Sequence, residues 1–174
     1  MKDIVSVGRV AMLHPLVSQE VTNAIDAIEC NSLPKNSKIR IVQGLRTIEE
    51  QDALYAQGRT KPGKIVTNAK GGSSFHNYGV AIDFAIMYDK DNNGIYEELS
   101  WNPDIDSDKN GQTEWKAVVD NFVALGWSWG GAWRTFKDLP HLEKTFKLSW
   151  REMFDKYNKK DFIPGTKYIN IIAK

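Results

Sequence analysis

The spacing of apolar residues predicts four helices along the chain. In three segments apolar side chains recur every three or four residues, which is the period of one helix face. A further helix begins with Thr47 and Glu50, the pattern of a capping box, and ends at Gly58. The predicted helices cover residues 14–30, 47–57, 114–125 and 149–157.

Short runs rich in β-branched and aromatic residues predict strands between these helices. Strands and helices follow one another without regular βαβ alternation, which favours an α+β fold with a small antiparallel sheet flanked by helices. Turn-rich loops are expected at 59–73, 88–95 and 102–112. The predicted strands cover residues 38–43, 79–87, 127–131 and 142–144, with a short run at 96–101 and an edge strand at Tyr168–Ile172.

Composition and charge narrow the class of protein. The chain has 174 residues, of which 41% are hydrophobic and 26% charged, the balance of a soluble globular domain. With 23 Lys and Arg against 22 Asp and Glu the net charge is +1, so no bulk field favours nucleic acid or a membrane surface. No stretch approaches the roughly 18 apolar residues of a membrane span, and the N-terminus lacks the apolar run of a signal peptide. We therefore expect neither nucleic acid nor a membrane span.

The single cysteine restricts the chemistry of any metal site. Cys30 alone can form neither an internal disulfide nor a thiolate zinc site, so a metal would be held by His, Asp or Glu. The chain contains three histidines, His14, His76 and His141. We expect His14 to face solvent at the start of a helix.

One acidic residue stands inside a predicted buried strand. A carboxylate such as Asp83 needs a partner there, and His76 precedes it by seven residues with a turn at Gly79 between them. With His141, two imidazoles and one carboxylate are sufficient to hold a catalytic zinc ion, and Asp138 is then placed to act as general base. On spacing alone, a locally bonded His76, a hydrogen-bonded Asp83 and a surface His141 remain the alternative.

Three separated motifs resemble those of the VanY and D-Ala-D-Ala carboxypeptidase-like zinc peptidases, in the expected order. Residues 44–51 match Gly-aliphatic-Arg-Thr-x-x-x-Gln, and residues 74–83 match Ser-x-His-x-x-Gly-x-Ala-x-Asp. Residues 129–143 closely resemble the branch that contains the L-alanyl-D-glutamate endopeptidases of phage endolysins. The resemblance covers roughly residues 12 to 145, and it implies the hedgehog/D-Ala-D-Ala peptidase-like fold.

The resemblance implies a ligand set and a catalytic base. His76, Asp83 and His141 fall on the family's three Zn²⁺ ligands, with one ion per chain, and Asp138 falls on its catalytic acid/base. Glu143 follows the last ligand by two residues, so in a strand it points the same way and could support the site or orient substrate.

Further residues carry implied roles in substrate binding. Arg46 falls on the arginine that binds the scissile carbonyl or stabilises the developing oxyanion, although an exposed ion pair is the alternative for such a residue. Ser74 and Gln51 fall on positions that help to hold the substrate or the site. Trp129 and Trp133 could line a groove, or they could belong to the core.

Two loops rich in Asp, Asn and Gly are candidates for a second kind of metal site. Each fits Asp-x-Asp-x-Asn-Gly, the first half of an EF-hand-type Ca²⁺ loop. Neither supplies the acidic twelfth position, where Ser100 and Ala117 stand, so ordinary polar turns are the alternative. The candidate ligands are Asp89, Asp91 and Asn93 in one loop and Asp106, Asp108 and Asn110 in the other.

The sequence thus predicts a zinc peptidase that cuts the stem peptide of bacterial peptidoglycan, with the L-Ala–D-Glu bond as the leading candidate. A D,D- or L,D-carboxypeptidase of the same family is one alternative. A catalytically silent zinc-containing binding domain, like the hedgehog signalling domains, is another, and Asp138 argues against it.

We expect a monomer and a single domain over 1–174, with a core at about 12–157 and no separate cell-wall-binding domain. The expected place of action is the cell wall, in the periplasm or outside the cell. The lack of a signal peptide fits a phage lysin released through a holin, or a trimmed chain.

Overall fold

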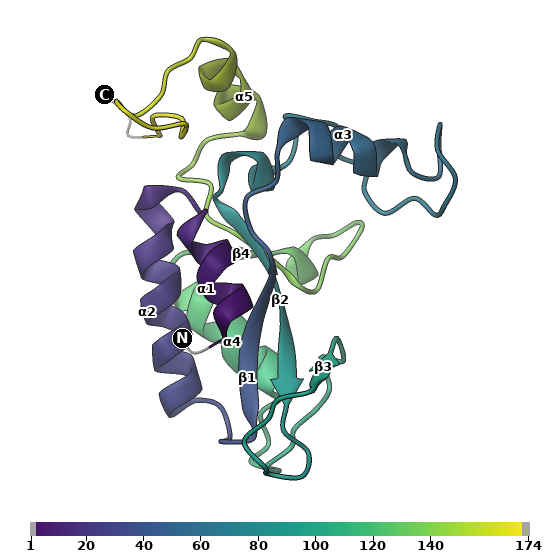
Figure 1. Ribbon diagram of the computed structural model, residues 1–174, viewed down its shortest axis with the longest axis vertical. Helices are drawn as coiled ribbons and strands as arrows, with labels where there is room; N and C mark the ends of the chain where they lie inside the picture. Colours follow the sequence, from purple (N-terminus) through teal and green to yellow (C-terminus); the bar gives the residue numbers. More distant parts are fainter. Residues whose placement is uncertain (1–2, 172–174) are drawn as a thin grey trace.

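The computed structural model describes residues 3–171, which form helices packed along a small sheet (Figure 1). The helices are α1 (Ile4–Ala11), α2 (Pro15–Asn31), α3 (Ile48–Ala56), α4 (Glu114–Ala124) and α5 (Trp150–Asn158). The strands are β1 (Ser37–Gln43), β2 (Ala81–Tyr88), β3 (Glu98–Ser100), β4 (Ser128–Trp129) and β5 (His141–Glu143). Two short 3₁₀ turns, η1 (Phe75–Tyr78) and η2 (Gly130–Ala132), precede β2 and follow β4.

The sheet is antiparallel throughout, with the strand order β1-β2-β5-β4 and β3 paired to the end of β2. The predicted α+β class is confirmed. The four predicted helices are present with shifts of a residue or two at their ends, and Thr47 forms the predicted capping box with Glu50.

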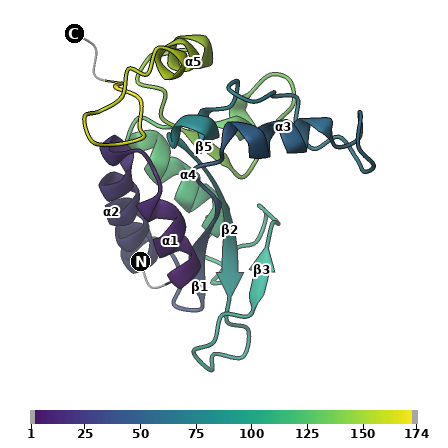
Figure 2. The ribbon, with the colours of Figure 1, turned by 45° about the horizontal axis from the view of Figure 1, so that its top comes forward.

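The two faces of the sheet have different roles. Along β2, Ile82, Phe84 and Ile86 are fully buried and belong to the core shared with α1, α2 and α4. Because side chains alternate along a strand, Asp83 points to the opposite face. Figure 2 shows α1, α2 and α4 lying along the sheet, while α3 projects from the end at which β2 begins. The side chain of Asp83 therefore faces away from the core.

Helix α1, which the sequence analysis did not predict, covers the free edge of β1. The Ser6 hydroxyl accepts a hydrogen bond from the Ile41 amide at 2.8 Å, and Arg9 donates to the Ile41 carbonyl at 2.7 Å. These bonds satisfy backbone groups that an exposed edge would leave open to other strands. Ser6 and Val10 are buried while Ile4 is 83% exposed, so hydrophobicity alone does not mark the face that packs.

The C-terminal segment differs from its prediction. The predicted strand over Tyr168–Ile172 is reduced to one isolated bridge between Phe162 and Ile169, and Ile172 lies outside the described residues. Within residues 3–171, no helix combines the length and the apolar character that crossing a membrane requires.

His14 is fully buried, and the expectation that it faces solvent is wrong. Its Nδ1 accepts the Leu16 amide at 3.2 Å, so Nε2 carries the proton and donates to the Ile169 carbonyl at 2.9 Å. The Tyr168 ring packs edge-on against it. A neutral His14 thus links the start of α2 to the C-terminal segment, a contact between residues 155 positions apart that local pattern cannot predict.

We expect His14 to stabilise the fold in a pH-dependent way. Burial lowers the pKa of His14 below the value of about 6.5 for an unfolded chain. Its contribution is therefore complete above that pH and is lost as the pH falls below it, because the unfolded chain takes up the proton first. His14→Ala should lower the free energy of unfolding by about 2 kcal/mol at neutral pH and by less near pH 5, measured by urea denaturation.

Tyr168→Phe is the control, because it removes a hydrogen bond to the Met12 carbonyl without removing a group that titrates near neutral pH. A cost of His14→Ala that is equal at both pH values, or greater at the lower one, would contradict this account.

Candidate active site

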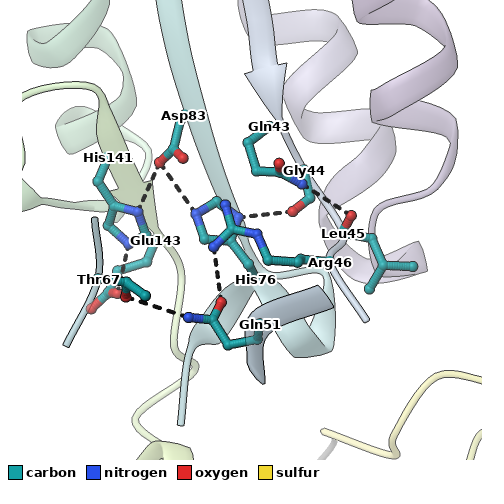
Figure 3. A network of polar contacts seen from close by, with 10 residues as sticks. All are labelled: Gln43, Gly44, Leu45, Arg46, Gln51, Thr67, His76, Asp83, His141 and Glu143. Atoms are coloured by element: carbon teal, nitrogen blue, oxygen red, sulfur yellow. Dashed lines mark hydrogen bonds and ion pairs between the residues drawn. The ribbon is translucent and has the colours of Figure 1, made fainter. Parts of the chain in front are cut away.

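Strand pairing brings two of the predicted ligands together. In the register of β2 and β5, Asp83 stands opposite His141, so both side chains leave the same face of the sheet. Asp83 Oδ1 lies 3.0 Å from His141 Nδ1. Glu143 is two residues further along β5, and its Oε2 lies 3.0 Å from His141 Nε2. Figure 3 shows these groups turned toward one another.

The third predicted ligand comes from the turn before β2. His76 lies in η1, which ends at Gly79 in the left-handed conformation, with φ of 70°. A Cβ at Gly79 would lie 2.8 Å from the His14 amide nitrogen, so both the conformation and the space require glycine. This turn places His76 Nε2 3.2 Å from Asp83 Oδ1.

The outer nitrogens of the two rings are held by acceptors. His76 Nδ1 lies 2.8 Å from the Gly44 carbonyl, which can only accept, so Nδ1 carries a proton and Nε2 is the nitrogen that faces Asp83. His141 donates a hydrogen bond from Nε2 to Glu143 in the same way. Nδ1 is therefore the nitrogen of His141 that faces Asp83 and could bind a metal ion.

The resulting donor set fits a metal ion. Candidate ligand atoms of His76, Asp83 and His141 lie within 4.8 Å of one another. In residues 3–171 no other group of His, Cys, Asp and Glu side chains meets that condition. Two imidazole nitrogens and a carboxylate oxygen suit zinc, and they leave a coordination position open.

Neighbouring groups shift the pKa values of Asp83 and His141. Burial opposes ionisation of Asp83, but the charge of His76 and hydrogen bonds from both histidines hold the pKa of Asp83 far below its usual range. Burial also opposes the charge on His141, yet its bonds to Asp83 and Glu143 raise the pKa of His141 to about 9. The surrounding carboxylates thus favour a cation at this point.

Asp138 lies in the same cavity as these groups. Its position depends on Gly130, because a Cβ there would lie 2.5 Å from the Asp138 carbonyl oxygen and 3.0 Å from His141 Cβ. Burial and the nearby charge of Asp83 raise the pKa of Asp138, while positive neighbours such as Arg46 act in the opposite direction. A carboxylate with a raised pKa is suited to accept a proton near neutral pH.

Arg46 also lines the cavity, and its orientation depends on Gln51. Arg46 Nη1 donates to Gln51 Oε1 at 2.8 Å (Figure 3). Gln51 Nε2 donates to the Ala69 carbonyl at 2.8 Å. Gln51 is fully buried and does not line the cavity. It therefore contacts Arg46 and the loop after α3, whereas Ser74 lies on the cavity wall.

One backbone–backbone and one side chain–backbone hydrogen bond join the first two motifs. The Arg46 amide donates to the His76 carbonyl at 3.0 Å, and Asn77 Nδ2 donates to the Arg46 carbonyl at 3.0 Å. Asn77 was not among the site residues predicted from the sequence. Its place beside His76, within the second motif, was the available signal.

The cavity is open and has a volume of about 620 Å³. The Trp133 ring centroid lies 5.3 Å from that of His141, so this tryptophan forms a wall, whereas Trp129 packs against the core and donates to the Leu139 carbonyl. The apolar side chains lining the cavity are Leu54, Val66, Ala69, Phe75, Trp133, Phe136 and Trp150.

The two Asp/Asn/Gly loops form hydrogen-bonded turns. Asp89 accepts the Gly94 amide at 2.7 Å, and Asp106 accepts the Gly111 amide at 2.9 Å. The metal-binding group found in residues 3–171 includes neither loop. The Ca²⁺ expectation therefore gains no support.

Comparison with known proteins agrees with this geometry. Residues 67–144 match a family model described as D-alanyl-D-alanine carboxypeptidase. The chain is 47% identical over 131 residues to the peptidoglycan L-alanyl-D-glutamate endopeptidase CwlK of Bacillus subtilis (strain 168), and the match covers 75% of this chain and 72% of that protein.

A solved structure, the Serratia marcescens L-Ala D-Glu endopeptidase ChiX, has a TM-score of 0.50 and 23% identity, covering 83% of this chain and 89% of that one, and it supports the fold. The chain belongs to the VanY-like D-alanyl-D-alanine carboxypeptidase family of peptidases, near its L-alanyl-D-glutamate endopeptidase branch.

Proposed function

We propose that this chain is a zinc-dependent peptidase that hydrolyses the L-Ala–D-Glu bond in the stem peptide of peptidoglycan. The observation that carries the proposal is the convergence of the His76, Asp83 and His141 donor atoms in an open cavity that also contains Asp138. The choice of bond follows the relative that is 47% identical.

His76, Asp83 and His141 would hold the zinc ion, which supplies Lewis acidity toward the scissile carbonyl and lowers the pKa of water to about 7. The outer hydrogen bond to the Gly44 carbonyl fixes which nitrogen of the His76 ring faces the ion.

The remaining steps are assigned to polar side chains of the cavity. Asp138 takes a proton from the water that attacks the carbonyl carbon, and it returns a proton to the amine as the C–N bond breaks. Arg46, oriented by Gln51, binds the carbonyl oxygen as negative charge develops on it. Ser74 on the cavity wall is assigned to hydrogen bonding with the peptide.

A carboxypeptidase that removes a terminal D-Ala is the second candidate, because the matching family model carries that description. A silent binding domain is less well supported, since Asp138 shares the cavity with the donor set and burial raises its pKa. We further propose that the chain acts as a monomer on the cell wall.

Mass analysis of digested muropeptides tests which bond of the stem peptide is cut. With zinc, a disaccharide-tetrapeptide and a disaccharide-pentapeptide that ends in D-Ala-D-Ala should each yield a disaccharide that keeps only L-Ala, together with a free peptide that begins with D-Glu. A chelator should stop the reaction, and added zinc should restore it. Loss of only the terminal D-Ala would favour the carboxypeptidase, and absence of cleavage by the zinc-loaded protein would favour a binding domain.

Replacement of Asp138 tests whether this residue is the general base. Asp138→Ala should lower the rate of wall lysis at least about 100-fold, because proton transfer is lost, while one zinc per chain remains bound. Metal content and turbidity of wall suspensions measure the two quantities. Asp120→Ala, at an exposed position on α4, is the control. Full activity of Asp138→Ala would exclude this mechanism.

A further inference from the structure

Glu143 is a carboxylate that the proposed hydrolysis leaves without a task. Its side chain is only 12% exposed, yet it has no lysine or arginine partner in the part of the chain that the structure describes. Its one hydrogen bond there is the 3.0 Å contact of Oε2 with His141 Nε2. Burial of a carboxylate costs free energy, so this contact with His141 is its compensation.

The strand geometry makes this contact specific. Glu143 and His141 are alternate residues of β5, so both side chains stand on the face that carries Asp83. Asp83 approaches His141 at Nδ1 and Glu143 approaches it at Nε2. The imidazole is therefore held at both nitrogens, and its ring has one orientation that satisfies both carboxylates.

The two histidines differ in their outer partners. His76 donates to the neutral carbonyl of Gly44, whereas His141 donates to the charged carboxylate of Glu143. A charged acceptor makes a stronger hydrogen bond and increases the electron density on the opposite nitrogen. His141 should therefore be the more strongly donating of the two imidazole ligands.

We propose that Glu143 is a positioning residue that fixes the ring of His141 and strengthens its Nδ1 as a metal ligand. This inference rests on the proposed zinc function. Glu143 would help to retain the ion, and Asp138 would remain the residue that transfers protons.

Zinc affinity of the metal-free protein, measured by competition with a coloured chelator, tests the proposal. Glu143→Ala should weaken zinc binding about 10- to 100-fold. Glu143→Gln, which keeps an acceptor but removes the charge, should fall between that variant and the unmodified chain. Glu98→Gln makes the same change at the far end of the sheet, where Glu98 pairs with Lys90, and should bind zinc normally.

Activity at saturating zinc separates positioning from catalysis. Peptidase activity of both Glu143 variants should return to within a few fold of the unmodified enzyme once the site is filled. Normal zinc affinity in both variants would overturn the proposal, and so would activity that stays lost at full zinc occupancy, because that result assigns Glu143 to the chemistry.

Two controls keep the outcomes distinct. Thermal unfolding of the metal-free variants reports whether each is folded, and the near-isosteric Glu143→Gln provides the test if Glu143→Ala is not. If the unmodified chain fails to bind zinc, the proposed function fails and this inference falls with it. If the unmodified chain binds zinc and the Glu143 variants bind it equally tightly, only this inference is overturned.

Discussion

The antiparallel pairing of β2 with β5 is the constraint on which the site depends. It sets Asp83 opposite His141, although they are 58 residues apart in sequence, and it sets Ile82 opposite Leu142 on the core face. Because a slip of one residue would turn each side chain to the other face, burial of the apolar pair fixes the register of the polar one. Packing of the core thereby positions the proposed ligands.

The carboxylates of the site favour a cation at its centre. Asp83 and Glu143 flank His141, and Asp138 lies in the same cavity. Arg46 offsets part of this negative charge but is itself bonded to Gln51, which sits outside the cavity. A metal ion held by two histidines and Asp83 would balance the carboxylates and leave Asp138 as the proton acceptor.

Local spacing predicted that His76 and Asp83 could lie together, whereas the place of His141 beside them followed from the family resemblance. The spacing of His76 and Asp83 across Gly79 reflects one turn and one strand, and both form as expected. The errors arise where distant contacts decide the outcome. His14 is buried by a bond to Ile169, and α1 packs through Ser6, so neither follows from local hydrophobicity. Burial of Gln51 likewise depends on its bond to Ala69, in the loop beyond α3.

The central claim is that His76, Asp83 and His141 hold zinc, and X-ray absorption at the zinc edge tests it most directly. For protein loaded with one zinc per chain, the account predicts two imidazole nitrogens at about 2.0–2.1 Å and oxygen at about 2.0–2.2 Å. Replacement of His76 by Ala should remove one imidazole from that shell. A shell containing sulfur at about 2.3 Å, for which Cys30 is the one thiol, or a shell without imidazole, would contradict the account.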